Sequence, residues 1–480
     1  MEKQMRIRYA PSPTGQLHIG NARTALFDYL LAKHYKGVFV LRVEDTDVAR
    51  NIKNADLDQI NDLKWLGVEI DEGAFVGGPY GPYFQLERLE IYKKYVDILI
   101  KEKKAYHCFC TEEKLENDKQ KQSKKGNMAF KYNRTCYKLT PAEIEKKLKL
   151  KTPYNVRFLV PENTTYKFKD LIRGDIEFKS LDIGDWIIQK TNKIPTYNFA
   201  VVIDDELMKI THVLRGEEHI SNTPKQIMIF EAFNWKIPTF GHLTIIVKEN
   251  RKKLSKRDND YLQFISQYRE LGYLPEAILN FLALLGWSPG NEKEIFSKDQ
   301  LIKMIDEKKF SKSPSVFDIK KLQWINSKYI KEMNDIDYIN FAKPFLEKYF
   351  NLDKKNKDWI NCFLITYKKE ILYADQLKTF AKPFFENTPS EKIDLSDINF
   401  HKELKEQLLM KISDCKNFSP DDLKSLIKEI GLELNIKGKE LYMPIRIMCS
   451  GAQHGPELNN VIYLLGKNKV IENIRNFNYE

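Results

Sequence analysis

Residues 5–43 constrain the fold of this chain most strongly, because they carry the pattern of a strand, a helix and a second strand. Apolar and polar side chains alternate over residues 5–10, as in a half-buried strand. From Ala22 apolar side chains recur at helical spacing, and residues 38–43 have the composition of a buried strand. This order predicts two parallel strands joined by a right-handed crossover. We therefore expect an α/β fold with a doubly wound parallel sheet.

The segment between the first strand and the helix has the chemistry of a nucleotide-phosphate site. Residues 8–20 read Arg-Tyr-Ala-Pro-Ser-Pro-Thr-Gly-Gln-Leu-His-Ile-Gly. Gly20 lets phosphate oxygens approach the backbone, and the amides of the following turn offer fixed positive ends. His18 adds a side-chain donor, although a lone histidine near a turn is more often structural. The segment as a whole predicts a site for ATP.

Two further strings carry charges suited to such a site. Residues 252–257, Lys-Lys-Leu-Ser-Lys-Arg, follow a strand and can close cations over a triphosphate, although a basic hexapeptide is more often a solvated loop. Residues 42–47, Arg-Val-Glu-Asp-Thr-Asp, place three carboxylates at the carboxyl end of a parallel strand, where doubly wound folds bind ligands. Helix capping by Thr46 or Asp47 is the alternative interpretation.

Composition limits the class of protein. The 480 residues suffice for about three domains of about 150 residues each. No run of about 18 apolar residues is present, and the chain enters its first strand without an apolar signal, so we expect a cytoplasmic protein with no membrane partner. Net charge is +11, and residues 101–151 hold 15 Lys and Arg against 7 Asp and Glu. That stretch suits either a nucleic-acid face or a solvated surface insertion.

The strings at 8–20, 42–47 and 252–257 together resemble the signatures of class I aminoacyl-tRNA synthetases, in the form found in bacterial-type glutamyl-tRNA synthetases. Further similar strings extend the resemblance over almost the whole chain, at residues 81–88, 317–326, 443–446 and 450–456. The resemblance implies a Rossmann-type catalytic sheet, an inserted domain that binds the tRNA acceptor end, and all-helical C-terminal domains that bind the anticodon.

The resemblance also implies a role for each matching residue. The residues implied to bind ATP are His18, Gly20, Glu218, Lys253, Ser255 and Lys256, with His18, Gly20 and Lys256 catalytic. Those implied to bind glutamate are Arg8, Ser12, Glu44, Tyr197 and Arg215. Arg8 and Arg215 suit that task because a guanidinium group binds a carboxylate through two hydrogen bonds and stays charged. Asp47 is implied to lie near the terminal adenosine of tRNA, and Val201 stands where some relatives have asparagine.

The domain boundaries expected from this pattern divide the catalytic sheet into two halves. We expect the parallel fold to resume at residues 195–203 and to run through residues 243–247. The expected domains are 1–104 for the first half of the catalytic domain, 105–195 for the inserted acceptor-binding domain, 196–250 for the second half, 251–326 for the stem-contact region with the Lys-Leu-Ser-Lys-Arg loop, and 327–480 for the helical anticodon-binding domains.

Three of the six cysteines resemble a zinc knuckle that some family members carry in the insertion. Cys108, Cys110 and Cys136 supply three thiols, whereas a structural zinc ion takes four ligands. Lys138 occupies the place of the usual histidine, which leaves the fourth ligand uncertain between Tyr137 and His107. A set of reduced thiols without metal is the alternative.

The function implied is ATP-dependent ligation of L-glutamate to the 3′ end of tRNA(Glu) through a glutamyl-adenylate, with release of diphosphate and AMP. ATP, Mg²⁺ and tRNA(Glu) are the implied partners, zinc is optional, and a monomer is expected. A non-discriminating enzyme that also charges tRNA(Gln) is an alternative. Two further alternatives are an inactive tRNA-binding paralogue and a short relative without an anticodon-binding part. The residues beyond 326 argue against the short relative.

Overall fold

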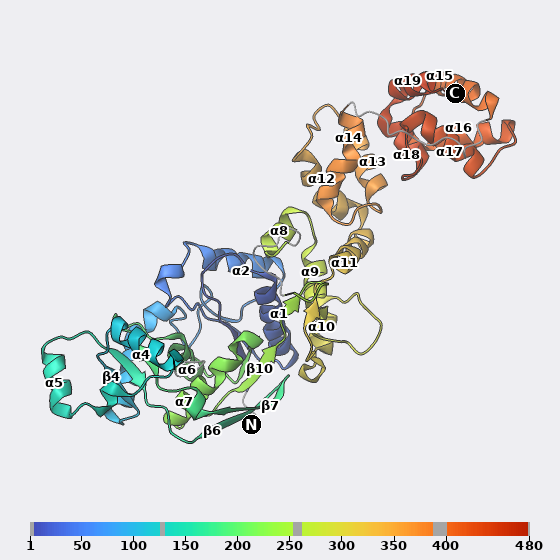
Figure 1. The fold of residues 1–480 in the computed structure, drawn as a ribbon. Helices are drawn as coiled ribbons and strands as arrows, with labels where there is room; N and C mark the ends of the chain where they lie inside the picture. Colours follow the sequence, from blue (N-terminus) through green and yellow to red (C-terminus); the bar gives the residue numbers. More distant parts are fainter. Residues whose placement is uncertain (1–3, 125–129, 253–261, 387–400, 479–480) are drawn as a thin grey trace. The chain divides into compact units, whose positions relative to one another are not determined.

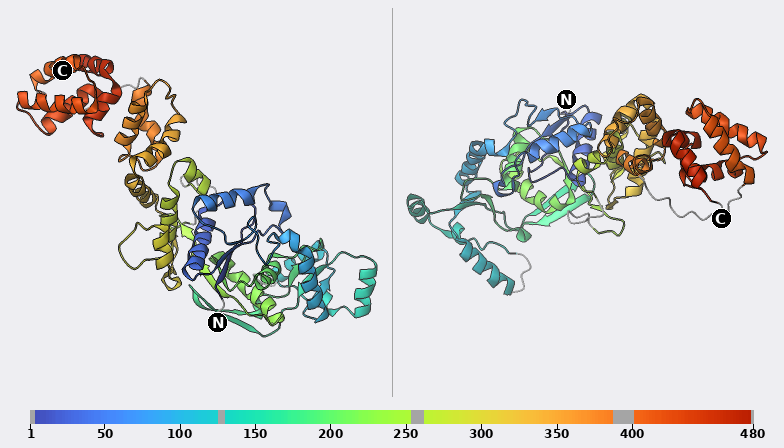
Figure 2. Two further views of the ribbon diagram at one scale, coloured as in Figure 1. Left: turned by 180° about the vertical axis from the view of Figure 1, so that it is seen from behind. Right: turned by 90° about the horizontal axis from the view of Figure 1, so that it is seen from above.

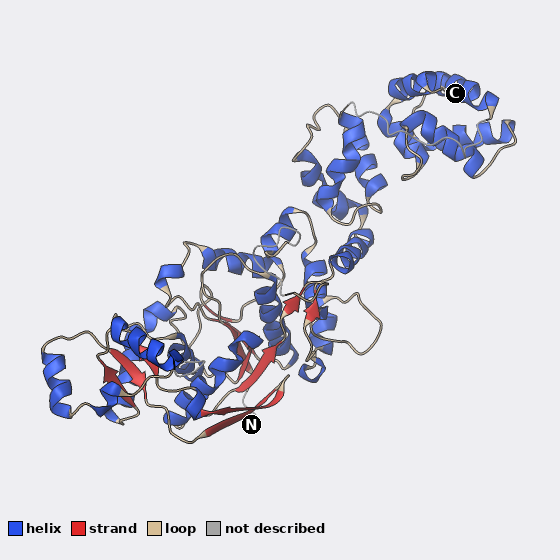
Figure 3. Ribbon diagram, viewed as in Figure 1, coloured by secondary structure: helices blue, strands red, loops and turns tan. Residues whose placement is uncertain are grey.

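The computed structural model describes residues 4–124, 130–252, 262–386 and 401–478. The chain divides into two compact units, drawn from blue to red along the sequence in Figure 1. The first unit comprises Met1–Tyr268 and Ile278–Ile319, and the second comprises Arg269–Ala277 and Lys320–Glu480. Figure 3 shows that the described strands all belong to the first unit, whereas the second is helical.

The first unit is built on a five-stranded sheet in the order β10-β9-β1-β2-β3, in which every pair is parallel. The strands are β1 (Arg6–Tyr9), β2 (Val38–Leu41), β3 (Glu72–Gly73), β9 (His212–Gly216) and β10 (Thr239–Leu243). The chain builds outward from β1 to β2 and β3, and later continues on the other side of β1 with β9 and β10. The doubly wound sheet predicted from the sequence is therefore confirmed.

Helix α1 (Ile19–His34) follows β1 and is buried over most of its circumference, including Ala22, Ala25 and Leu26. It connects β1 to its parallel neighbour β2, so the predicted strand-helix-strand unit is present. At the edge of the sheet, Gly73 has φ +137° and lies so close to β2 that a Cβ atom would meet the Leu41 carbonyl oxygen at 2.0 Å. Only glycine permits β3 to pair with β2 in this way.

The parallel fold does not resume with a strand at residues 195–203. The segment forms helix α6 (Tyr197–Leu207), and the sheet resumes only at β9. Phe199 through Asp205 are all buried, with Val201, Val202 and Ile203 at 0% exposure. A segment buried on every side shows no periodicity, so the sequence alone does not distinguish a helix from a strand here.

The segment between α3 (Leu89–Lys101) and α6 carries two antiparallel sheets. One contains β4 (Ala105–Cys108), β5 (Asn155–Phe158) and β8 (Trp186–Gln189), and the other is the hairpin of β6 (Thr165–Asp170) and β7 (Gly174–Lys179). Helices α4 (Glu112–Lys124) and α5 (Pro141–Lys149) belong to the same segment. The two views of Figure 2 show the hairpin beside α7 (Thr223–Ala232) and β10. The end of β6 is fastened to the main sheet, since Leu171 N donates to the Phe240 carbonyl at 2.9 Å.

The remaining elements complete the chain. The first unit also has α2 (Ala55–Trp65), the parallel pair of β11 (Ile246–Val247) with β12 (Ser315–Val316), and α10 (Lys298–Met304). The helices along the rest of the sequence are α8 (Ile265–Glu270), α9 (Pro275–Leu284), α11 (Ile319–Glu332), α12 (Asp335–Glu347), α13 (Lys357–Tyr367), α14 (Leu377–Phe385), α15 (Lys402–Asp414), α16 (Pro420–Glu433), α17 (Lys439–Ser450), α18 (Leu458–Leu465) and α19 (Lys467–Asn476).

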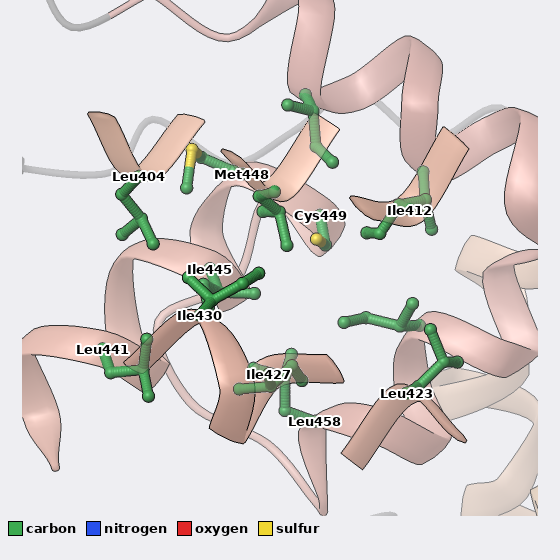
Figure 4. Close-up of a cluster of buried hydrophobic side chains, with 14 residues drawn as sticks. Leu404, Ile412, Leu423, Ile427, Ile430, Leu441, Ile445, Met448, Cys449 and Leu458 are labelled. Carbon is green, nitrogen blue, oxygen red and sulfur yellow. The ribbon is translucent and has the colours of Figure 1, made fainter. Parts of the chain in front are cut away.

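Helices α15–α19 enclose a hydrophobic core of their own within the second unit, shown in Figure 4. Leu408, Ile412 and Ile445 are fully buried in it, and Leu423 approaches from α16. Every one of these helices presents aliphatic side chains at helical spacing to the shared interior. In the described part of the chain, no helix has the length and apolar character needed to cross a membrane.

Candidate active site

A cavity of about 1030 Å³ opens at the carboxyl ends of β1 and β9. These neighbouring strands mark the point where the strand order reverses, which is the ligand site of open parallel sheets. Predicted residues from distant parts of the chain line this one cavity, namely Arg8, Ser12, His18, Gly20, Glu44, Asp47, Tyr197, Arg215 and Glu218. The remaining predicted ATP residues, Lys253, Ser255 and Lys256, lie outside the described residues.

Arg8 lies at the end of β1 and is 4% exposed. Its Nε atom pairs with Asp205 Oδ1 at 3.2 Å, and the same carboxylate oxygen accepts from Arg42 Nη1 at 2.8 Å. Burial alone raises the pKa of Asp205, but Arg8 and Arg42 outweigh this effect and hold it below its usual value. Asp205 thus remains ionised and orients two buried guanidinium groups.

Glu44 follows β2 and is 7% exposed. Burial raises the pKa of its carboxyl group, and the opposing attraction of Arg42, whose Nη2 lies 3.2 Å from Glu44 Oε1, limits the rise. A buried carboxylate with a single close cation retains acceptor capacity for a second positive group, because an ionised carboxylate has about four lone-pair positions.

Arg215 lies on β9, in register with His242 on β10, and is 5% exposed. Its Nε donates to His242 Nε2 at 3.2 Å, Nη2 donates to Thr223 Oγ1 at 2.8 Å, and Nη1 donates to the Tyr197 hydroxyl at 3.3 Å. An arginine side chain has five N–H donors, so two remain for a ligand in the cavity.

His18 is the N-cap of α1, where its Nδ1 accepts from Gly20 N at 3.1 Å. Nε2 therefore carries the ring proton, and it lies 3.2 Å from Gln263 Oε1. The sequence predicts free backbone amides in the first turn of α1, but His18 Nδ1 accepts a hydrogen bond from one of them, that of Gly20. This hydrogen bond nevertheless holds the imidazole ring of His18 at the N-terminus of α1, which is the positive end of the helix dipole.

The other predicted residues lie nearer the solvent. Asp47 is partly exposed and accepts from Arg50 Nε at 2.6 Å, so its side chain does not cap the short 3₁₀ helix Val48–Arg50. Ser12 and Glu218 are exposed at the cavity wall. Val201 is buried in α6 and is not part of the wall.

Asp205, His242 and Asp170 were not predicted. Asp205 belongs to α6 and pairs with Arg8 across 197 residues of sequence. Asp170 ends β6 in the insertion and pairs with His242 across 72 residues. Nothing local marks these side chains, because their partners come together only when distant strands pair.

The three cysteines of the insertion lie together. Their sulfur atoms are within 4.8 Å of one another, and Cys110 Sγ and Cys136 Sγ are 3.5 Å apart. The Tyr132 hydroxyl lies 3.5 Å from Cys108 Sγ and 3.2 Å from Cys110 Sγ.

The two residues considered as fourth ligands face elsewhere. His107 packs against Phe109 and Tyr154, and Tyr137 packs against Tyr106 and is 49% exposed. Tyr132 was missed because it stands four residues before Cys136, outside the spacing considered. Three soft sulfur donors and one phenolic oxygen make a donor set suited to zinc.

Family comparisons agree with this geometry. Residues 4–324 match the family described as tRNA synthetases class I (E and Q), catalytic domain. Residues 337–478 match the family described as anticodon binding domain. The fold is that of a class I tRNA synthetase for the glutamate and glutamine group.

Relatives that match along the full chain narrow this class. The glutamate–tRNA ligase of Lysinibacillus sphaericus is 48% identical over 489 residues, which cover 99% of this chain and 100% of the relative. That of Mycoplasma capricolum is 50% identical over 475 residues, 98% of both chains. A crystal structure of a glutamate tRNA ligase from Elizabethkingia meningosepticum, in complex with its amino acid, matches with a TM-score of 0.89 at 34% identity, over 98% of this chain and 99% of that one. The chain belongs to the glutamate–tRNA ligase family.

Proposed function

We propose that the protein activates L-glutamate with ATP and transfers the glutamyl group to tRNA(Glu). An α-carboxylate oxygen of glutamate attacks the α-phosphorus of ATP, diphosphate leaves, and a glutamyl-adenylate remains. A terminal ribose hydroxyl of the tRNA then attacks the carbonyl carbon, and AMP leaves. The observation that carries the proposal is that one cavity is lined by Arg8, Arg215 and Glu44 and also by His18 at the start of α1.

The charge of the buried site supports glutamate as the substrate. The buried guanidinium group of Arg215 donates to His242, Thr223 and the Tyr197 hydroxyl, which are all uncharged. Glutamate carries one net negative charge and glutamine carries none. A buried cation without an anion is unfavourable, so the site favours glutamate by several kcal/mol.

Each of the three site residues has a distinct role in this proposal. Arg8 and Arg215 bind the substrate carboxylates, together with Ser12 and Tyr197, which line the same cavity. Glu44 binds the substrate ammonium group. No side-chain nucleophile is needed, because positioning and charge stabilisation carry the rate.

The ATP end of the site uses helix α1 and the loop at 252–257. His18, Gly20 and Glu218 contact the nucleotide from the cavity wall. Lys253 and above all Lys256 neutralise charge that develops on the departing diphosphate, Ser255 donates a hydrogen bond to the nucleotide, and Mg²⁺ accompanies ATP as its counter-ion. Lys256→Ala is therefore expected to lower the activation rate by about 100-fold or more while leaving tRNA affinity nearly unchanged.

The tRNA is proposed to contact both units of the chain. Residues 105–195 receive the acceptor end, Asp47 lies near the terminal adenosine, residues 251–326 contact the stem, and residues 327–480 bind the anticodon. The family match over residues 337–478 supports the last assignment. A monomer suffices, since one chain supplies each of these parts.

A zinc ion is proposed in the insertion, held by Cys108, Cys110, Cys136 and Tyr132. The residues fit the ion, because the three sulfur atoms already converge and the phenolic oxygen lies beside two of them. The ion would fix the loop after β4 to the segment around Cys136. Its role is structural and it takes no part in the reaction.

Two assays test the proposed function. ATP–diphosphate exchange with glutamate is measured with and without tRNA, because family members generally require tRNA for activation, and charging of purified tRNA(Glu) and tRNA(Gln) follows. We expect charging of tRNA(Glu). Charging of both tRNAs would identify the non-discriminating form, and charging of neither, with tRNA binding retained, would identify an inactive paralogue.

A further inference from the structure

Arg215 is held by a chain of buried side chains that starts in the insertion. Asp170 ends β6, His242 lies on β10, and Thr223 begins α7. Their exposed fractions are 2%, 0% and 0%. Asp170 Oδ2 lies 2.6 Å from His242 Nδ1, and His242 Nε2 lies 3.2 Å from Arg215 Nε.

The hydrogen bonds fix the tautomer of His242. Arg215 Nε can only donate, so His242 Nε2 must accept, and the ring proton resides on Nδ1, where it donates to Asp170. Asp170 Oδ1 also accepts from the backbone amides of Ile172, Arg173 and His242, at 2.9, 2.9 and 3.2 Å. Asp170 is therefore held as an ionised acceptor.

The surroundings of His242 keep the imidazole neutral. Burial lowers its pKa, Asp170 raises it, and the charge of Arg215 lowers it again, with a net decrease. Phe168 and Phe240 are the rings beside it, and Thr223 Oγ1 lies 3.1 Å from Nε2. Glu218 is the other charged group that acts on it, and it raises the pKa.

We propose that Asp170 and His242 are positioning residues that set the orientation of Arg215 for glutamate through the Nδ1–H tautomer. The inference rests on the proposed role of Arg215 in binding glutamate. His242 and Thr223 occupy one edge of the guanidinium group and Tyr197 takes a donor of Nη1, so two N–H groups stay directed to the cavity. A carboxylate accepts this number in a bidentate pair.

Asp170→Asn tests the tautomer with little change of shape. The three backbone amides require an acceptor and keep the amide oxygen in the Oδ1 position. The NH₂ group then occupies the Oδ2 position and donates to His242 Nδ1, which moves the ring proton to Nε2, against Arg215 Nε–H. We expect KM for glutamate to rise by about tenfold or more and KM for ATP to change by less than about twofold.

Asp375→Asn is the matched control, since Asp375 is equally buried at 2% exposure but belongs to the second unit. At saturating tRNA it should leave KM for glutamate unchanged. Arg215→Lys distinguishes the proposed role of Arg215 in binding glutamate from the proposed positioning role of Asp170 and His242. If Arg215→Lys leaves KM for glutamate unchanged, the proposed role of Arg215 is wrong. If it raises KM and Asp170→Asn does not, the positioning role alone is wrong.

A double-mutant cycle tests whether Asp170 acts through Arg215. In the Arg215→Lys background, Asp170→Asn should have little further effect on KM for glutamate, and an undiminished effect would overturn the inference. The tautomer can also be read in the unmutated protein by ¹⁵N-histidine NMR, with the His242 signals assigned by their loss in His242→Gln. A proton on Nδ1 is expected, and a proton on Nε2 would contradict the proposal even if Asp170→Asn failed to fold.

Discussion

Asp205 shows at the scale of one residue how the site holds several buried charges together. A single carboxylate, 3% exposed, pairs with Arg8 and Arg42, and Arg42 in turn pairs with Glu44. Desolvating these groups is costly, so the cluster is stable only while each charge retains its partners. The arrangement holds the guanidinium group of Arg8 in place in the cavity where we propose that glutamate binds.

Removing the charge of Asp205 should therefore affect both stability and binding. Asp205→Asn is expected to lower the free energy of unfolding by about 3 kcal/mol, because two buried guanidinium groups lose part of their compensation. KM for glutamate should rise as Arg8 loses its orientation. Urea unfolding followed by steady-state kinetics measures both. Glu206→Gln, at the next position in a surface pair with Lys209, should change neither.

His219 provides a pH-dependent prediction. Burial and then the positive charge of Arg215 lower its pKa from 6.5 to about 4. The unfolded chain therefore binds more protons than the folded chain between these two values, and stability is lost as pH falls from about 6.5 towards 4. Thermal unfolding at several pH values should show a shallower slope for His219→Asn than for the parent. Equal slopes would mean that His219 is not the group responsible.

At the scale of an element, His18 combines two tasks at the start of α1. It caps the helix through Gly20 N, and it lines the cavity. His18→Ala should lose both functions, at a cost of about 1 kcal/mol in stability for the cap. His18→Asn should restore the cap, because asparagine is a strong N-cap residue. Its activation rate should still be about 100-fold lower, as measured by diphosphate exchange. Full activity in His18→Asn would show that His18 acts only as a cap.

The cysteine cluster combines Cys108 at the end of β4, Cys110 in the following loop and Cys136 in the short helix Thr135–Lys138. We expect one zinc ion per chain by atomic absorption, and a lower melting temperature after chelation. Cys136→Ser should abolish binding, and Tyr132→Phe should weaken it by removal of one ligand. Tyr137→Phe is the matched control and should bind normally. If protein prepared in the presence of zinc contains no metal, the zinc proposal is wrong, and the three cysteines are reduced thiols.

At the scale of the whole molecule, the chain divides into two compact units, and the core of α15–α19 belongs entirely to the second. We expect two calorimetric transitions. Leu408→Ala should destabilise one of them by about 2–5 kcal/mol, because Leu408 is fully buried. Met410→Ala on the same helix should have little effect, since Met410 is 56% exposed. Glutamate should raise the melting temperature of the other transition, that of the first unit, and leave the transition affected by Leu408→Ala unchanged.

Sequence patterns predicted the parallel sheet and the helix after β1, because these depend on local periodicity. They also predicted the cavity-lining residues within 8–20 and 42–47, because each of these segments is a contiguous motif. They did not predict α6, since a completely buried helix and a buried strand present the same apolar run. They also missed Tyr132, whose distance from the first two cysteines along the chain hides its approach to the sulfur atoms.

The sequence by itself determined which side chains carry the charges of the site and which segment begins the sheet. Only the tertiary structure decided which of these charges meet. Asp205 reaches Arg8 across 197 residues, and Asp170 reaches His242 across 72, because α6 and β6 pack against the main sheet. Periodicity is a property of neighbours along the chain, whereas the strength and orientation of a buried ion pair depend on distance in space.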